Sequence, residues 1–325
     1  MISPDQGQAP GRGGTRGSGT GPAHRQEGPA DTGSRRVAAS SGPVDVRSDS
    51  LEVRTGGGGR HRPAPAGGPV TGGAQLPGAR VLEVDLGRGV RAGFTERAGG
   101  VSVGPWAGLD LGLHVGDDPG DVQRNRRLLL GWAGAPVQFP RQVHGTDVLV
   151  VDASARGLLT GVDPAEPARD AIVTAAVGVP VGVLVADCVP VLLADPVAGV
   201  VGAAHAGRKG LLRGVVENAV AAMCALGASP ARIYAAIGPC AGPCCYEVPE
   251  QLRAESARRL PQTWAGTRWG TPSLDLPGGC RAALERVGVT RLSTIGRCTI
   301  EDKSYYSYRR EPVTGRFAGV VMMSA

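Results

Sequence analysis

A chain of 325 residues is long enough for one large domain or two ordinary ones, and a net charge of +6 makes it only mildly basic. Aromatic residues make up 4% of the chain, too few for the stacking surfaces that bind bases, so we expect no nucleic-acid partner. No stretch is long and charge-free enough to span a bilayer, so we expect no membrane partner either.

Residues 1–78 are rich in Gly, Pro, Ser, Thr and Arg, and they show no periodic apolar pattern. A segment of this composition buries too little apolar surface to offset the entropy of ordering its backbone. It also lacks the apolar core of a secretory signal. We therefore predict a disordered leader over residues 1–78, followed by a single folded domain over residues 79–325.

The predicted elements of that domain begin with a strand-like run at 80–85 and a helix over 116–134. Asp118 is expected to cap this helix, and Pro119 is expected at its first position, where the missing N–H has no intrahelical partner to lose. Five short apolar runs follow and are typical of buried strands, at 147–152, 171–174, 181–186, 191–194 and 199–204.

The second half of the domain mixes helices and strands. Residues 211–227 carry apolar side chains at helical spacing and end at Gly227, so they predict one continuous helix. The remaining helices are predicted over 248–260 and 277–288, and the remaining strand-like runs are 232–237, 292–296 and 317–323. Because strands outnumber helices and do not alternate strictly with them, the pattern predicts an α+β fold with a mixed sheet.

The seven cysteines are Cys188, Cys224, Cys240, Cys244, Cys245, Cys280 and Cys298. An odd number of thiols without an export signal favours reduced cysteines in a cytoplasmic protein. Cys240 and Cys244 have the spacing of half a zinc site, but no second cysteine pair at zinc-finger spacing follows them. We therefore do not predict a structural zinc in this segment.

Three chemistry-bearing residues of the predicted domain lie at junctions between strands and loops. His144 stands in QVHG before a strand-like run, Cys188 stands in ADCVP after one, and His205 stands in AAHAG at the end of another. Such junctions meet at one rim of a sheet. A thiolate with two imidazoles suits a catalytic zinc with one open position. A copper site usually adds a weak axial Met, and none of the four Met lies in these loops.

A metal-free interpretation uses the same residues. Cys188 would then be a nucleophile, with His144 or His205 as its base. The adjacent Asp187 opposes a thiolate at Cys188, and no helix N-terminus is predicted there to offset it. A third interpretation treats the three as unrelated loop residues, and we expect His114 to cap or pack and not to bind metal.

Several motifs resemble those of the YfiH/YlmD family, whose members were first described as laccase-domain proteins or polyphenol oxidases and include bacterial purine nucleoside phosphorylases. The resemblance covers residues 80–325 and rests on RQVHGTDV, ADCVPVLLADP, AAHAGRKGLLRGVV, AIGPCAGPCCYEV and YYSYRREPVTGRFAGVV. It implies a mixed α/β sandwich similar to the catalytic domain of cytotoxic necrotizing factor.

The same resemblance implies one catalytic zinc held by His144, Cys188 and His205. The implied activities are phosphorolysis of adenosine, inosine, guanosine or methylthioadenosine, and hydrolytic deamination of adenosine, so the expected partners are purine nucleosides and phosphate. Some relatives are linked to peptidoglycan editing. The alternative function is therefore a cysteine hydrolase or peptidoglycan-editing amidase that uses Cys188 and His205.

Phosphorolysis requires an anion site beside the sugar, and four basic residues are candidates for it: Arg97, Arg141, Arg208 and Lys209. The segment AGRKG opens a predicted helix, whose free amides attract phosphate. Asp187 is the candidate general acid or base, since it is the carboxylate nearest to the expected zinc ligands in the sequence.

The chain departs from the common family pattern at two places. Arg208 and Lys209 stand where many relatives have Trp and Arg, and Lys cannot make the bidentate phosphate contact of Arg. Asp110 stands where relatives commonly have Asn, which is expected to alter a hydrogen bond.

Overall fold

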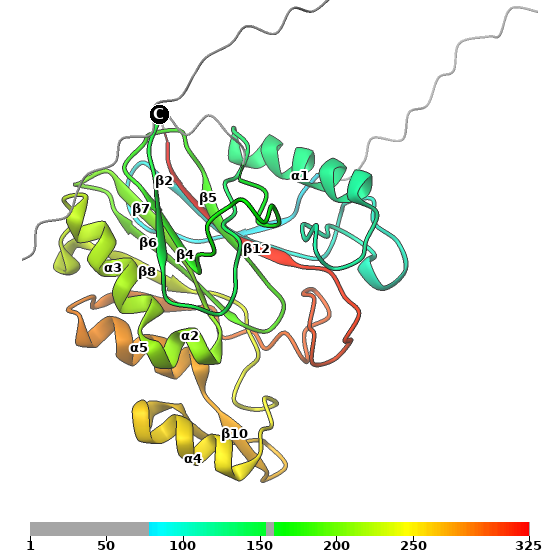
Figure 1. Cartoon of the computed structure of the whole chain (residues 1–325), viewed down its shortest axis with the longest axis vertical. Coiled ribbons are helices and arrows are strands. Elements are labelled where there is room, and N and C mark those ends of the chain that lie inside the picture. The colour runs from blue at the N-terminus through cyan, green and yellow to red at the C-terminus, as the bar shows by residue number, and fades with distance from the viewer. Residues whose placement is uncertain (1–77, 154–158, 325) are drawn as a thin grey trace, which may run out of the picture. The chain divides into compact units, whose positions relative to one another are not determined.

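The structure, a computed structural model, describes residues 78–153 and 159–324. Apart from Gly78, the predicted leader lies outside the described residues. The described strands form two main sheets, which lie face to face, and a separate two-stranded hairpin (Figure 1).

The smaller main sheet is antiparallel throughout. In spatial order it consists of β1 (Val81–Glu83), β2 (Val90–Thr95), β12 (Phe317–Met323) and β5 (Val181–Val185). The larger sheet is mixed, with a parallel pair at each edge. In spatial order it consists of β11 (Arg291–Thr294), β8 (Tyr234–Ile237), β6 (Val189–Asp195), β7 (Val200–Ala206), β4 (Ala171–Thr174) and β3 (Val148–Val151). The hairpin consists of β9 (Trp264–Gly266) and β10 (Pro272–Leu274).

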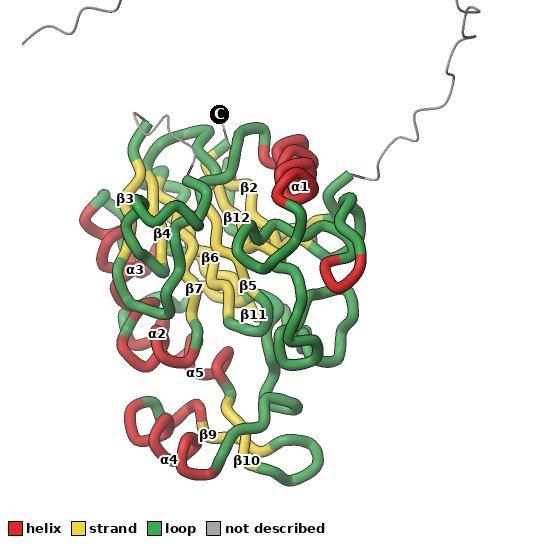
Figure 2. The backbone as a smooth tube through the Cα atoms, turned by 45° about the vertical axis from the view of Figure 1, so that its right-hand side comes forward, coloured by secondary structure: helices red, strands yellow, loops and turns green. Residues whose placement is uncertain are grey.

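Helices cover the outer faces of both sheets (Figures 1 and 2). The smaller sheet is covered by α1 (Pro119–Ala133). The larger sheet is covered by α2 (Arg208–Arg213), α3 (Val215–Ala225) and α5 (Leu276–Arg286), while α4 (Glu250–Arg259) lies beside the β9–β10 hairpin. Three short 3-10 turns lie at Gly104–Trp106, Pro230–Arg232 and Pro261–Thr263. No helix in the described part of the chain combines the length and apolar character needed to cross a membrane.

The apolar strands are buried on both faces because each main sheet lies between two other layers. In β12, Val320 packs toward α1 while its neighbour Val321 packs toward the larger sheet. In β6, Leu192 faces the smaller sheet while Val191 faces the helices. This is why these strands appear in the sequence as continuous apolar runs without a polar face. The predicted mixed-sheet fold is confirmed, and its similarity to cytotoxic necrotizing factor stays a prediction.

The predicted helix over 211–227 is wrong in one respect, because two helices occupy the segment. Gly214 adopts a left-handed conformation with φ of 98° and separates α2 from α3. A helical pattern does not reveal such a break, since apolar side chains continue on both sides of it. The first helix begins as predicted, with the Asp118 carboxylate accepting hydrogen bonds from the amides of Gly120 and Asp121.

The buried carboxyl of Asp110 supports a prediction about stability. One of its oxygens accepts hydrogen bonds from the amides of Gly112 and Arg316, while the other has no partner among the described residues. Burial, aided by the charge of Asp117, raises the pKa of Asp110 from 3.8 to about 7. Ionising this group in the folded protein is therefore costly.

Asp110→Asn should raise the free energy of unfolding by about 1–3 kcal/mol at pH 8, because it removes the cost of a buried, half-paired charge. A carboxyl whose folded pKa lies above its unfolded value loses stability as the pH rises from about 4 to about 7. The gain should therefore vanish near pH 4. Urea unfolding of both proteins at pH 4.5 and pH 8 measures it, and an equal difference at both pH values would contradict this explanation.

Candidate active site

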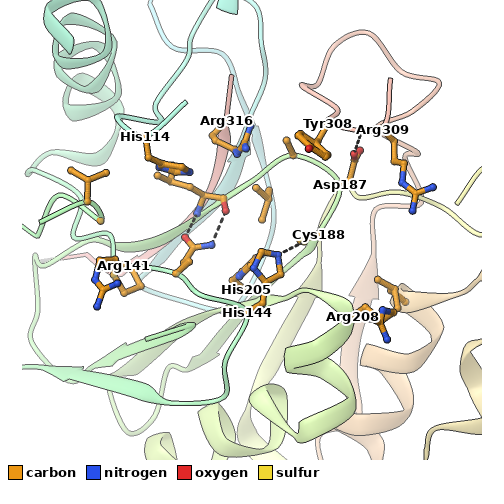
Figure 3. A pocket seen from close by; sticks show the side chains of 18 of the residues that line it. His114, Arg141, His144, Asp187, Cys188, His205, Arg208, Tyr308, Arg309 and Arg316 are labelled. Carbon is orange, nitrogen blue, oxygen red and sulfur yellow. Dashed lines mark hydrogen bonds between the residues drawn. The ribbon is translucent and has the colours of Figure 1, made fainter. Parts of the chain in front are cut away.

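The structure brings the three predicted metal ligands together at one end of the larger sheet (Figure 3). Cys188 lies in the turn between β5 and β6, His205 lies in β7, and His144 lies in the loop before β3. One ligand atom from each residue lies within 4.8 Å of the other two. The Cys188 Sγ is 3.6 Å from the His144 Nε2, and the two imidazole rings meet edge to face with centroids 4.7 Å apart.

His205 lies inside a strand, since β7 extends two residues beyond the predicted run at 199–204. Val201 and Ala203 on the same face of β7 belong to the core between the sheets. Alternation along the strand therefore directs His205 toward the same space, where that core ends. The imidazole is 3% exposed.

Asp170 orients both histidines, and the sequence-based prediction missed it. Its carboxylate accepts a hydrogen bond of 2.7 Å from the Nδ1 of His205. It also accepts hydrogen bonds from the backbone amides of Val143, His144 and Gly145, at 3.1, 2.8 and 2.6 Å. Because the Nδ1–H of His205 is hydrogen-bonded to Asp170, its Nε2 is left to bind a metal. A carboxylate behind the imidazole in this way is usual for metal-binding histidines. The available signal was an acid placed directly before the apolar run 171–173, which begins a buried strand.

The backbone around the three ligands is strained at two positions. His144 has φ of 60° and Asp187 has φ of 94°, and they are the non-glycine residues with positive φ in the described chain. The loop that carries His144 is held to β5 by Gln142, whose amide pairs with both backbone groups of Leu184 at 2.8 Å. Such conformations persist only where the surrounding contacts hold them.

Gly207 leaves room for the ligands themselves. A Cβ at this position would lie 2.5 Å from the Cδ2 of His144 and 3.2 Å from the Cys188 Sγ. Any side chain here would displace the His144 ring, so glycine is required directly after the strand that carries His205.

The electrostatics of the site favour an ionised thiol. Burial opposes ionisation of Cys188, but the charge of His205 and the hydrogen bond from His144 lower its pKa to about 6. Burial likewise opposes the charged form of His205, but the Cys188 thiolate and the Asp170 carboxylate raise its pKa to about 9. The two shifts favour a thiolate at Cys188 paired with a protonated His205.

The three predicted ligands face a cavity of about 670 Å³, within the usual range for a small-molecule site. Its charged wall residues are four arginines and one acid, so the cavity is cationic. They are Arg141, Arg208, Arg309, Arg316 and Asp187. Tyr246, Tyr308 and His114 add aromatic surface. Burial, followed by the charges of Arg316 and Arg126, lowers the pKa of His114 to about 4, so its imidazole is neutral at pH 7.

The predicted anion-binding residues divide into two groups. Arg141 and Arg208 line the cavity, and Arg208 has no hydrogen-bond or ion-pair partner within the described residues. Arg97 and Lys209 do not line it. The Arg97 guanidinium lies over the Tyr306 ring at 4.9 Å and pairs with Glu311, so it serves packing away from the cavity.

Asp187 lines the cavity beside Cys188, and both of its oxygens accept hydrogen bonds. The Thr299 hydroxyl donates to one at 2.6 Å, and the Arg309 amide donates to the other at 2.7 Å. Asp187 thus ties the turn that carries Cys188 to the loop after β11. Its role as a general acid or base stays a prediction.

A thiolate and two imidazole nitrogens converge beside this cavity, and the three donors fit a zinc ion with one position left for water or substrate. The fold and the site therefore define a mixed α/β protein with a candidate metal site open to a small-molecule cavity.

Residues 91–324 match the family described as "Multi-copper polyphenol oxidoreductase laccase", and the chain belongs to this family. It is 53% identical over 233 residues to purine nucleoside phosphorylase ORF3 of Streptomyces griseus, covering 71% of this chain and 93% of that protein. It is 38% identical over 248 residues to purine nucleoside phosphorylase YlmD of Geobacillus stearothermophilus, covering 72% and 90%.

Solved structures agree with this assignment. The crystal structure of YlmD from Geobacillus stearothermophilus matches with a TM-score of 0.67 and 37% identity, covering 73% of this chain and 93% of that one. The Bacillus licheniformis hypothetical protein YfiH matches with a TM-score of 0.66 and 31% identity, covering 72% and 93%. The resemblance to the YfiH/YlmD family is thereby confirmed.

Proposed function

We propose that this protein is a zinc-dependent purine nucleoside phosphorylase that acts on adenosine, inosine, guanosine and methylthioadenosine and also deaminates adenosine. The observation that carries the proposal is one cavity that combines a Cys/His/His site with the unpaired cation Arg208 and tyrosine rings. The names of the relatives support the phosphorylase reaction. We place the enzyme in the cytoplasm, where its seven free thiols stay reduced, and assign catalysis to residues 79–325.

The ligand set favours zinc over the copper of the family description. A multi-copper centre requires many imidazoles, whereas the described residues contain three, His114, His144 and His205. Among the described residues that line the cavity there is no Met to act as the axial ligand of a type-1 copper site.

His144, Cys188 and His205 would hold the zinc, which when bound supplies Lewis-acid polarisation of an oxygen of water or substrate. Asp170 keeps the proton on the Nδ1 of His205, so that the lone pair of the His205 Nε2 remains available to bind the metal. In phosphorolysis a phosphate oxygen bonds to C1′ of the sugar as the bond to the purine nitrogen breaks. Arg208 and Arg141 bind that phosphate, and the neutral His114 imidazole can donate or accept a hydrogen bond at the purine.

Incubation with adenosine, with and without phosphate, tests the proposal. With phosphate we expect adenine and ribose-1-phosphate together with inosine and hypoxanthine, and without phosphate we expect inosine alone. Chelation should stop every product, and zinc should restore them. Purified, metal-free protein that remains fully active would overturn the zinc requirement, and an absence of ribose-1-phosphate would overturn the phosphorylase assignment.

Arg208→Ala should raise the KM for phosphate about 10- to 100-fold, the effect of losing one charge-assisted hydrogen bond. Lys209→Ala is the matched control, because it removes the adjacent charge outside the cavity. Deamination of adenosine, which uses no phosphate, should be nearly unchanged in both variants. Equal effects of the two substitutions on phosphate KM would show that Arg208 acts only through general charge.

The lowered pKa of Cys188 supports a second candidate function, a cysteine hydrolase or peptidoglycan-editing amidase that uses Cys188 and His205. Nucleophilic cysteines typically have a lowered thiol pKa beside a protonated imidazole, as Cys188 has with a pKa of about 6 beside His205. That reaction would survive chelation and would be blocked by alkylation of Cys188, whereas bound zinc should protect the thiol from alkylation.

A further inference from the structure

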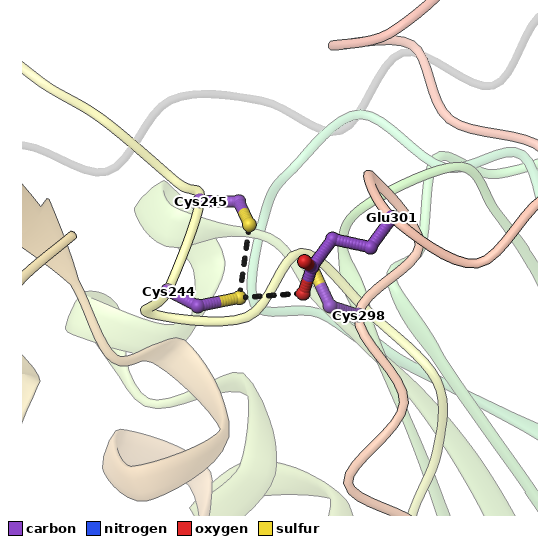
Figure 4. Close-up of side chains that lie close together, drawn as sticks. All are labelled: Cys244, Cys245, Cys298 and Glu301. Atoms are coloured by element: carbon purple, nitrogen blue, oxygen red, sulfur yellow. Dashed lines mark hydrogen bonds between the residues drawn. The ribbon is translucent and has the colours of Figure 1, made fainter. Parts of the chain in front are cut away.

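A second group of metal-ligating side chains lies outside the cavity. Cys244 and Cys245 follow β8, while Cys298 and Glu301 follow β11 (Figure 4). One ligand atom from each of the four lies within 4.8 Å of the other three. Cys240, which has zinc-site spacing to Cys244 in the sequence, is not part of this group. The structure instead buries Cys240 in the helix-side core and brings Cys298 and Glu301 from a distant segment.

The backbone holds the two contributing loops in register. Cys240 and Cys298 form a parallel bridge. The Cys240 amide donates to the Arg297 carbonyl at 3.2 Å, and the Thr299 amide donates to the Cys240 carbonyl at 2.9 Å. The four ligand side chains are therefore brought together by paired main chain and not by chance contact of mobile loops, which is the support that a metal site needs.

Two N–H donors point at sulfurs of the cluster. The Gly242 amide donates to the Cys298 Sγ at 3.3 Å. The Arg268 guanidinium donates to the Cys245 Sγ at 3.3 Å and also pairs with Glu301. Hydrogen bonds to ligating atoms are a regular feature of metal sites.

We propose that Cys244, Cys245, Cys298 and Glu301 form a second, structural site for one zinc ion. Three thiolates and one carboxylate fill a tetrahedral sphere, which leaves no open position and distinguishes this site from the three-ligand site in the cavity. The Cys244 and Cys245 sulfurs are 2.9 Å apart, and zinc would separate them to about 3.8 Å by rotation of the half-buried Cys244 side chain.

This zinc would stiffen the wall of the active-site cavity. The Ala241 amide, on the first loop, donates to the Asp187 carbonyl at 2.9 Å. Thr299, on the second loop, donates its hydroxyl to the Asp187 carboxylate. Joining the two loops through a metal therefore restrains the turn that carries Cys188 from both sides.

The test uses the full chain with Cys188→Ala, which removes the single thiolate of the cavity site. After chelation, titration with Co²⁺ should bind one ion with a sulfur-to-cobalt charge-transfer band and the visible spectrum of tetrahedral cobalt, and Zn²⁺ should displace it. Adding Cys298→Ala should remove most of the band, whereas adding Cys224→Ala, a half-buried cysteine outside both clusters, should leave it unchanged.

Glu301→Gln supplies a second variant on an exposed side chain, in case Cys298→Ala does not fold. It should keep the thiolate band and weaken cobalt affinity about 10-fold or more. Three results would overturn the proposal: no thiolate band in the Cys188→Ala protein, a band indifferent to both Cys298→Ala and Glu301→Gln, or a disulfide among the three cysteines in freshly purified protein.

Discussion

Replacing Cys188 with alanine should lower kcat/KM for adenosine phosphorolysis about 1,000-fold and leave the cavity site without zinc. Cys188 would be the only anionic donor among the three proposed zinc ligands, and two imidazoles alone would hold a dication weakly. Loss of the Lewis acid removes several kcal/mol of transition-state stabilisation, and each 1.36 kcal/mol corresponds to about a tenfold change in rate. Steady-state kinetics and metal content of the same preparation measure both effects.

Cys224→Ala is the matched control for this substitution, since Cys224 lies on α3 away from the cavity and both cysteine clusters. It should keep wild-type activity and zinc content. A Cys188→Ala protein that turns over nucleosides at the wild-type rate would exclude the zinc mechanism. A variant that retains stoichiometric zinc in the cavity site but is inactive would instead favour Cys188 as a nucleophile.

Asp170→Asn should weaken zinc binding at the cavity site about 10- to 100-fold, the usual effect of removing a carboxylate behind a ligating histidine. It should also lower the free energy of unfolding by about 2–4 kcal/mol at pH 7. The buried carboxylate accepts hydrogen bonds from His205 and three consecutive amides. An amide NH₂ at one oxygen position would face those N–H groups and leave at least one unsatisfied, at about 1–3 kcal/mol each.

The stability loss should depend on pH with a defined sign. Burial tends to raise the pKa of Asp170, but the hydrogen bond and charge of His205 and the amides of Gly145 and Val143 outweigh it and lower the pKa below 3.8. Such a group contributes stability above its unfolded pKa and loses it as the pH falls through its folded value. The difference between wild type and Asp170→Asn should therefore be full at pH 7 and shrink below about pH 4.

Denaturant unfolding of the metal-free proteins separates this effect from zinc binding. Asp147→Asn is the control, because it removes a nearby but exposed carboxylate whose side chain is 71% accessible. It should change neither stability nor zinc affinity appreciably. If Asp170→Asn behaves like Asp147→Asn, the hydrogen bonds of Asp170 do not support the site in the way described.

The strands that form the middle of the fold were predictable because they are buried on both faces. β4, β5 and β6 appear as nearly continuous apolar runs, in which Thr174 and Asp195 are the polar side chains. β2 was missed because its sequence, VRAGFT, is not a continuous apolar run and contains Arg91 and Gly93. A glycine is required at position 93 because β1 packs closely against it: a Cβ there would lie 2.5 Å from the Val81 side chain. The need for glycine arises from a neighbouring strand, which a local pattern does not show.

The three proposed zinc ligands could be identified from residue type and strand position. The residue that holds two of them in place, Asp170, could not. Asp170 is opposite His205 only because β4 and β7 pair as neighbours, a relation between segments far apart in the chain. The same limit applies to the second cysteine cluster, whose Cys298 arrives through the bridge to Cys240. Arg97 shows the converse case, a basic residue in a family-like motif that the fold directs to Tyr306.

The position of β12 has a consequence for how the chain folds during synthesis. β12 lies between β2 and β5 and pairs with both, although it is translated long after either of them. Until β12 arrives, β2 and β5 each present an unpaired, apolar strand edge, a template for association with other chains. Pairing over such sequence separations is also slow to form. The nascent chain should therefore depend on chaperone protection until its last strand is inserted, and C-terminal truncations should aggregate even though they retain every proposed zinc ligand.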